Sequence, residues 1–451
     1  MWSTHPAVRD IMAVKLPIAP PHTLETLCKL LKQLQPLLRH LHRDHFSDLR
    51  EQQQSARLFN RSYNNIQGTL SCFRRKSKPK NDISLLIPPV RLLSNNNVEW
   101  LKYGDDYTKL FFAKTKQRKL ASYIYSLQNS QGQYKEGFER VGHIMFQFYK
   151  ILLGSQPGSR NQLDHSIITL GPVLTKEQQI QLCKDFSDRD IREAFFSIPN
   201  TKSPDPDGYT SGFFKTIWPQ FGLAICSAVR DFFHSGQLPK SISLTKLVVL
   251  LKVQHPQSAS DFRPISCCNI LYKCLTKLLS HRIKEILPYL IHQSQGAFVK
   301  GLEILYNILI CQDLARGYQR QHISPRCMLK IDLQKAFDSV HWGFLQDLLV
   351  GLKFPPIFVS WIMKCVSSVT FSVHINGQDC GSFEGGRGLR QGDPLSPLLF
   401  VLTMEYFSRS MQQISQAKNF KYHPHCKGLG LIHLIFADDL ILFCKADPTT
   451  L

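Results

Sequence analysis

The sequence feature that most constrains the fold is a pair of apolar segments that carry acids at their ends. Residues 327–333 form a strand-like run with Asp332 near its end, where an unpaired buried carboxylate would need a cationic partner. Residues 431–443 hold two more apolar runs, joined by Asp438 and Asp439. Alone, such an Asp-Asp pair is most often a turn. Combined with Asp332, it is what two adjacent strands need to hold two divalent cations for in-line phosphoryl transfer.

The charge of the chain indicates a polyanionic partner. Among 451 residues, 55 are Lys or Arg and 34 are Asp or Glu, which gives a net charge of +21 with His neutral. Residues 1–160 carry 25 of the basic and only 11 of the acidic residues. The hydrophobic share of 43% is typical of a globular chain, so general disorder is excluded.

The cysteine and hydropathy patterns indicate in which cellular compartment the chain is expected. The 13 cysteines include no C-x-x-C pair, so we expect reduced thiols, mostly in the core, rather than disulfides or a zinc site. We find no uninterrupted apolar stretch of the roughly 18 residues that a bilayer span needs, and no signal-peptide core. We therefore expect no membrane association and a nuclear or cytoplasmic location.

The order of expected elements predicts an α+β fold, because strands and helices mix without a steady β-α-β rhythm. A leucine stripe predicts a helix over residues 23–59 with a kink at Pro36, and a basic run at 74–80 is typical of nuclear import or phosphate contact. A second cationic helix is expected at 107–127. Further helices are predicted at 176–196, 270–287, 336–350 and 398–414, and strands at 246–251, 326–333, 369–376 and, as a hairpin, 431–444.

Between the acids lies a glycine-rich loop, residues 385–397, that opens a helix. Asp393 can cap this helix and Pro394 fits its first turn. Capping does not explain why Arg387, Arg390 and Gln391 crowd at the same end. Glycines let a backbone approach a nucleotide or template closely, and the Gln391 amide offers both a donor and an acceptor.

These residues resemble a known family. Segments 330–340, 388–397 and 436–439 closely resemble motifs A, B and C of non-LTR (LINE-type) retrotransposon reverse transcriptases, particularly those of plants. Upstream, segments that resemble the fingers motifs and the connector before the polymerase occur in the family's order, at residues 100–105, 148–154, 203–208, 261–266 and 295–301.

The resemblance implies an RNA-directed DNA polymerase that transfers dNTPs to a primer 3′-OH on an RNA template, with Mg²⁺ or alternatively Mn²⁺. Asp332, Asp438 and Asp439 would be the catalytic acids and metal ligands, with the Leu333 carbonyl as an extra ligand. Phe337 would be the aromatic gate against a ribose 2′-OH. The implied nucleotide and template contacts are Lys252, Arg263, Phe337, Arg390, Gln391 and Gly392.

The implied architecture is a right-hand polymerase with fingers and palm. We expect a basic helical extension of unknown function at 1–95, a connector at 96–173, fingers at 174–325 and an incomplete palm at 326–451. The sequence ends twelve residues after Asp439. The family's motif D, primer grip and thumb would follow, so we expect none of them in this chain.

Three interpretations remain open at this point. The first is the polymerase core itself. The second is a truncated, catalytically weak or inactive remnant that only binds nucleic acid, since contacts that position the primer terminus would be missing. The third, a group II intron maturase, fits the fingers motifs less well. Oligomeric state and template identity do not follow from the sequence.

The excess of basic residues predicts salt-sensitive binding. We expect the purified chain to bind a primer–template at low salt and to lose affinity steeply between about 50 and 200 mM salt, because bound cationic side chains release counterions from phosphates. Fluorescence anisotropy across a salt series measures the slope. Affinity that is absent at low salt, or that does not change with salt, would contradict all nucleic-acid interpretations.

Overall fold

The computed structural model describes residues 21–46, 117, 120, 122–155, 162–200, 207–316, 318 and 324–447. Apart from the first two residues, the chain divides into two compact units, residues 3–33 with 124–451, and residues 34–123. The basic run at 74–80, the connector segment at 100–105 and most of the cationic helix expected at 107–127 lie outside the described residues. The end of that helix was predicted wrongly, because Ser126–Gln128 form a strand. No helix in the described ranges is long and apolar enough to cross a membrane.

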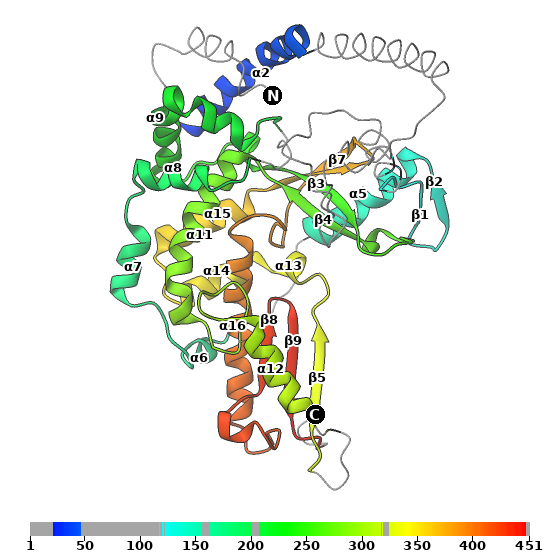
Figure 1. Cartoon of the computed structure of the whole chain (residues 1–451), viewed down its shortest axis with the longest axis vertical. Coiled ribbons are helices and arrows are strands. Elements are labelled where there is room, and N and C mark those ends of the chain that lie inside the picture. The colour runs from blue at the N-terminus through cyan, green and yellow to red at the C-terminus, as the bar shows by residue number, and fades with distance from the viewer. Residues whose placement is uncertain are drawn as a thin grey trace, which may run out of the picture. The chain divides into compact units, whose positions relative to one another are not determined.

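The larger unit contains two sheets of different design (Figure 1). The first has the order β4-β3-β6-β7, and its central pair β3 and β6 is parallel while both outer pairs are antiparallel. The second sheet is antiparallel, with the order β5-β9-β8, and a small hairpin, β1-β2, stands apart. The strands are β1 (Ser126–Gln128), β2 (Tyr134–Glu136), β3 (Leu244–Leu251), β4 (Phe262–Cys267), β5 (Cys327–Asp332), β6 (Thr370–Ile375), β7 (Gln378–Glu384), β8 (His433–Phe436) and β9 (Asp439–Cys444).

Helices surround these sheets, and the mixture confirms the predicted α+β class. The long helix α16 runs beside the β5-β9-β8 sheet in Figure 1, and α5 packs on β6 and β7 of the other sheet. The α-helices are α2 (Leu24–Phe46), α5 (Phe138–Gly154), α6 (His165–Ile168), α7 (Lys176–Cys183), α8 (Asp188–Phe196), α9 (Ser211–Ser235), α10 (Lys240–Ser243), α11 (Ile270–Leu290), α12 (Ile304–Ala315), α13 (Ala336–Ser339), α14 (Trp342–Gly351), α15 (Pro356–Ser367) and α16 (Ser396–Ser415); short 3₁₀ turns are η3 (Ala259–Asp261) and η4 (Lys427–Leu429).

Two predicted helices are each broken in two by a cap. The helix expected at 176–196 ends at Cys183, and Ser187 starts α8 with a capping box in which Asp190 returns the hydrogen bond. The helix expected at 336–350 is divided at Val340, because the His341 ring accepts hydrogen bonds from the first amides of α14. Helix α2 runs through Pro36, and residues 47–59 of its predicted span lie outside the described residues.

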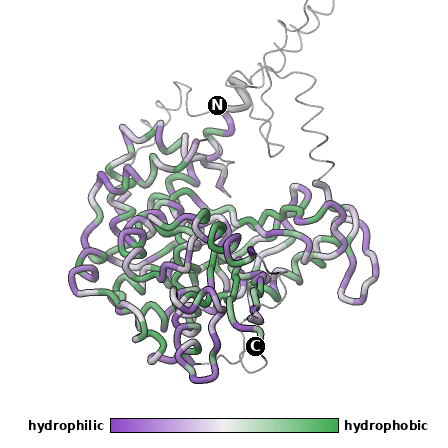
Figure 2. Tube along the Cα trace, turned by 60° about the horizontal axis from the view of Figure 1, so that its bottom comes forward, coloured by the Kyte–Doolittle hydropathy of each residue, from purple (hydrophilic) through white to green (hydrophobic). Residues whose placement is uncertain are grey.

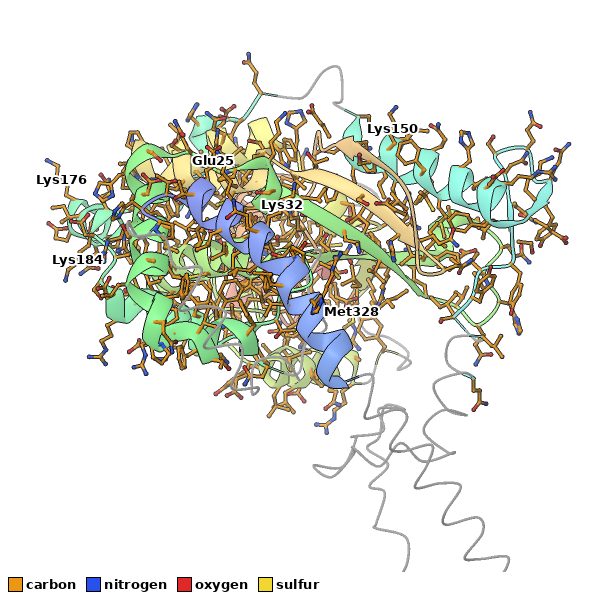
Figure 3. All side chains as sticks on the ribbon, turned by 90° about the horizontal axis from the view of Figure 1, so that it is seen from above. Glu25, Lys32, Lys150, Lys176, Lys184 and Met328 are labelled. Atoms are coloured by element: carbon orange, nitrogen blue, oxygen red, sulfur yellow. The ribbon has the colours of Figure 1, made fainter. Side chains whose placement is uncertain are left out.

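The interior is mostly apolar, with a few buried charged side chains such as Arg409 and Glu405. Figure 2 shows the hydrophobic, green parts of the trace concentrated within the bundle of elements. In Figure 3, Lys176 and Lys184 extend outward from the two ends of α7, and both are exposed. The twelve cysteines in the described residues are all free thiols, as expected, but only five are fully buried, so the prediction that most lie in the core was too strong.

One buried ion pair connects α16 to two other parts of the unit. Arg409 is 1% exposed, and its Nε donates to Glu405 Oε1 at 2.8 Å. Its other nitrogens donate to the carbonyls of Ile168 and Leu290, among others. Glu405 in turn accepts from the amide of His292. The Arg409 guanidinium and the Glu405 carboxylate therefore pair with each other and have further hydrogen bonds. This is the condition under which buried charge is tolerated.

We predict that Arg409→Met lowers the free energy of unfolding by about 3–5 kcal/mol, because it leaves the Glu405 carboxylate buried without its partner. Arg189→Met is the matched control, since Arg189 and Glu193 form another pair four residues apart at the same 2.8 Å but on the surface. We expect the control to cost less than about 1 kcal/mol. Urea unfolding of both variants measures the difference, and equal losses would contradict this account.

Candidate active site

The register of β5 and β9 brings the predicted acids together. Asp332, the last residue of β5, is the direct partner of Asp439, the first residue of β9. Directly opposed residues in an antiparallel pair have Cα atoms about 4.5–5.5 Å apart. Asp438 lies in the tight β8–β9 turn, where Ala437 adopts a left-handed φ of 57°. Thus the two acidic segments predicted to lie on adjacent strands do so.

The acids lie at an open pocket of about 730 Å³. Asp332 and Asp438 line this pocket and both are exposed, so the expectation of a buried carboxylate at the strand end was wrong. Asp439 is not among the lining residues and is 3.3 Å from Lys330 Nζ in an exposed ion pair. The structure therefore separates two acids that face the pocket from a third that faces a lysine.

The donor set fits a divalent cation that also binds substrate. In the described part of the chain, no three His, Cys, Asp or Glu side chains form a group that could hold a metal by themselves. Mg²⁺ is usually bound by one or two carboxylates together with substrate phosphates, because it gives up its water ligands reluctantly. Asp332 and Asp438, with the Leu333 backbone at the same pocket, supply the hard oxygen atoms that this mode requires.

Two cationic side chains line the same pocket as the acids. Lys252 follows directly after β3, and Arg263 lies on β4; both line the pocket and are exposed. The Lys252 ammonium donates to the carbonyl of Ser260 at 2.9 Å, which anchors it beside η3. Opposite charges at one pocket suit a ligand that carries phosphates and a metal, because Lys and Arg offset phosphate charge while carboxylates hold the cation.

The glycine-rich loop binds the backbone of α13. The amide of Gly388 donates to the Val340 carbonyl at 2.8 Å, and the amide of Leu389 donates to the Phe337 carbonyl at 2.7 Å. Gly388 has a φ of +87°, and a Cβ atom there would be only 2.9 Å from the Asp338 carbonyl oxygen. Only glycine therefore permits this approach of loop and helix.

Gln391 and Gly392 lie where the loop meets β4. The carbonyl of Gln391 accepts from the Ser266 amide at 2.8 Å, and its side-chain Nε2 donates to Asp338 Oδ1 at 3.2 Å. Gly392, at a φ of +110°, would place a Cβ atom 3.2 Å from the Ser266 carbonyl oxygen. Both residues line the pocket, as the predicted contact with nucleotide or template requires.

The two loop arginines have structural partners. Arg390 borders the pocket but is only 5% exposed, and its guanidinium stacks 4.3 Å from the Tyr272 ring centroid. The Arg387 Nε donates to the Leu152 carbonyl at 2.7 Å. These contacts explain why arginines crowd at this end of the loop, and contact of Arg390 with a nucleotide stays a prediction.

The predictions that Asp393 caps this helix and that Pro394 lies in its first turn are wrong. Helix α16 begins at Ser396, and Leu395 rather than Asp393 occupies its N-cap position. Asp393 accepts from the Leu395 amide and from the Tyr272 hydroxyl while being buried. It thus supports the turn before the helix and joins that turn to α11.

Phe337 lies in the pocket wall at the position expected for a gate. It belongs to α13, and its ring stacks on that of Phe400 from α16, with centroids 4.6 Å apart and planes 19° from parallel. This stacking holds the ring in one orientation, because an aromatic pair contributes about 0.5–1.5 kcal/mol beyond burial alone. A fixed ring is what exclusion of a 2′-hydroxyl would need.

Asp338 is a pocket residue that the sequence analysis missed. It is 5% exposed, and burial raises the pKa of its carboxyl to about 6, with the Gln391 hydrogen bond and Lys252 acting in the opposite direction. The sequence contained a signal, since an acid directly after the gate aromatic in a short helix is unusual among apolar neighbours. Perturbed acids in a cleft are frequent at functional sites.

Carboxylates, cations and a glycine-rich loop around one pocket are the groups that a nucleotidyl-transferring polymerase site needs. Residues 252–450 match the family model described as reverse transcriptase (RNA-dependent DNA polymerase). The chain therefore contains a reverse transcriptase domain, and its similarity to retrotransposon proteins identifies the domain as the non-LTR type.

Three similar proteins illustrate this relationship. The transposon TX1 uncharacterized 149 kDa protein of Xenopus laevis is 29% identical over 67% of this chain. The Pol polyprotein of the type-2 retrotransposable element R2DM of Drosophila melanogaster is 28% identical over 63%. A probable RNA-directed DNA polymerase from transposon BS of the same fly is 23% identical over 51%. The matches span only 23%, 24% and 26% of those proteins, respectively.

We predict that Gly388→Ala destabilises the chain more than Gly377→Ala. Both glycines have a φ of +87°, but an added Cβ meets nothing within 4 Å at Gly377. Each variant incurs the left-handed backbone cost of about 1–2 kcal/mol. Only Gly388→Ala also forces the loop away from α13, so we expect a further loss of unfolding free energy in urea. Equal losses would show that the close approach is unimportant.

Proposed function

We propose that this chain copies RNA into DNA by adding deoxynucleotides to a primer 3′-hydroxyl. The observation that carries the proposal is the placement of Asp332 and Asp438 on one pocket with Lys252, Arg263 and Gln391. The assignment as a reverse transcriptase domain supports the reaction type. Because the chain matches about a quarter of the first relatives' length, activity, template and primer are proposed for it and not carried over from them.

In this proposal the acidic residues bind the metal ions and the basic residues bind the phosphates. Asp332 and Asp438 would hold two Mg²⁺ ions, with the Leu333 carbonyl as a further ligand, and Mn²⁺ could replace them. When bound, the ions activate the primer hydroxyl and stabilise charge on the phosphates. Lys252 and Arg263 bind and orient the triphosphate or the template opposite the acids.

Asp439 has a supporting role in this proposal. It lies beside Asp332 in the strand register, but its carboxylate pairs with Lys330 outside the pocket. As the third acid it would contribute negative potential to the site and could become a ligand only if the pair with Lys330 opened. Its substitution should therefore be milder than that of the other two acids.

Selection of deoxynucleotides is assigned to Phe337. Its ring lines the pocket and is held by Phe400, so a ribose 2′-hydroxyl would meet a fixed surface. Residence in the nucleus is part of the proposal, since the template and the target of such an element are nucleic acids and the chain carries +21 net charge.

We predict that the purified chain extends oligo(dT) on poly(rA) with Mg²⁺ in the low millimolar range. Asp332→Asn and Asp438→Asn should each lower the rate by at least about 100-fold, because each removes a charge that holds the metal. Asp439→Asn should retain more activity than either. Extension by purified protein, measured as labelled product over time, checks the order of the three variants.

The control is Asp313→Asn, which removes an exposed acid on α12, away from the pocket. Full activity in this variant shows that loss of charge alone is harmless. Extension that survives Asp332→Asn or Asp438→Asn would contradict the assigned site. Salt-sensitive binding by all variants without any extension would instead favour the alternative function, binding of nucleic acid without copying.

A further inference from the structure

Gln391 is hydrogen-bonded to other elements through both its backbone and its side chain. Its backbone carbonyl accepts from Ser266 on β4, and its side chain donates to Asp338 on α13. The side-chain amide carries one acceptor, Oε1, and one donor group, Nε2. One of the two N–H groups of Nε2 bonds to Asp338 and no described residue donates to Oε1, so the oxygen is the acceptor that remains for a ligand in the pocket.

We propose that Asp338 is a positioning residue that sets the hydrogen-bond polarity of Gln391, so that the pocket presents an acceptor to a donor on the bound nucleotide or template. An ionised carboxylate can only accept hydrogen bonds, so it can pair only with the Nε2 end of the amide. This inference rests on the proposed function, and it adds a residue to which the sequence pattern assigned no role in the site.

The surroundings of Asp338 suit this role. It is almost fully buried in α13, between the loop that carries Gln391 and helix α5. Tyr149 of α5 is also buried, and burial followed by the charge of Asp338 raises the pKa of its phenol. The Tyr149 hydroxyl has no hydrogen-bond partner in the described residues, so it does not bond to Asp338. The side chain that does bond to Asp338 is that of Gln391.

The charges that face Asp338 are few. Lys252 and Lys335 favour its ionised form, and both are exposed at the pocket. The loop arginines do not pair with it, because Arg387 donates to the Leu152 carbonyl and Arg390 to the Cys365 carbonyl. Burial outweighs the two lysines and raises the pKa of Asp338 to about 6.

Which end of the Gln391 side-chain amide faces the pocket should therefore depend on pH. Above pH 6 the carboxylate accepts from Nε2 and the oxygen of Gln391 is free. Below pH 6 the protonated acid can itself donate to Oε1, so the amide can turn and present its donor group. A ligand donor would then meet another donor, and binding would weaken as the pH falls.

The test measures binding of dTTP to the chain with poly(rA)/oligo(dT) and Ca²⁺ in place of Mg²⁺, so that no turnover is needed. We expect Asp338→Asn to raise the Kd for dTTP on the order of 10-fold at pH 8, because a hydrogen bond to a charged group is lost. We expect the Kd of the parent to rise as the pH falls through 6, and that of Asp338→Asn to lack this step. Protonation of the triphosphate affects both proteins alike.

A double-mutant cycle separates positioning from a structural role. In a Gln391→Met background, Asp338→Asn should change the Kd for dTTP by less than 2-fold, because the amide it orients is gone. An effect of Asp338→Asn that is equal in both backgrounds would overturn the proposal. Asp313→Asn serves again as the charge control, and thermal unfolding checks that each variant is folded.

The outcomes also distinguish this inference from the proposed function. Binding of dTTP by the parent that Asp338→Asn leaves unchanged would overturn the positioning role alone. Absence of dTTP binding by the parent, with primer–template bound, would overturn the proposed polymerase function and the positioning role with it.

Discussion

The site depends above all on the register between β5 and β9. Side chains on a strand alternate between the two faces of the sheet, so a shift of one residue would move Asp332 to the opposite face, away from Asp438. The register is held by apolar packing, because Met328, Phe443 and Leu434 belong to one cluster with Leu314 of α12. Stability of the sheet and geometry of the carboxylates are therefore set by the same contacts.

A second constraint joins the acids to the rest of the pocket. The glycine-rich loop has hydrogen bonds to α13 at Gly388 and to β4 at Gln391, so it connects the sheet of β3 and β4 with the segment that follows Asp332. The buried cluster of Tyr272, Arg390 and Asp393 fixes the other end of this loop against α11. The cationic side chains and the carboxylates thus line one pocket, and this loop is bonded to the elements that carry both.

The sequence identified those parts of the site whose residue types are unusual for their place in a strand or loop. Acids at strand ends and glycines before a helix depart from ordinary patterns, and the structure brings Asp332, Asp438 and Gln391 to one pocket. It could not distinguish Asp439 from Asp438, because which of the two side chains points into the pocket depends on backbone angles in the preceding turn, such as the φ of 57° at Ala437. The sequence analysis also missed the breaks before Ser187 and His341, because a local helix cap outweighs the periodicity of apolar residues.

Asp338 illustrates what only three dimensions show. In the sequence it lies in the segment after Asp332, within the helix predicted at 336–350, and the pattern assigns it no role. The structure shortens that helix to four residues and covers it with the loop, so the carboxyl is buried and its pKa is raised to about 6. Burying an ionisable group costs stability unless the group is hydrogen-bonded or paired. Its one side-chain hydrogen-bond partner in the described residues is the Gln391 amide, and orientation of that amide is a use that accounts for both the burial and the contact.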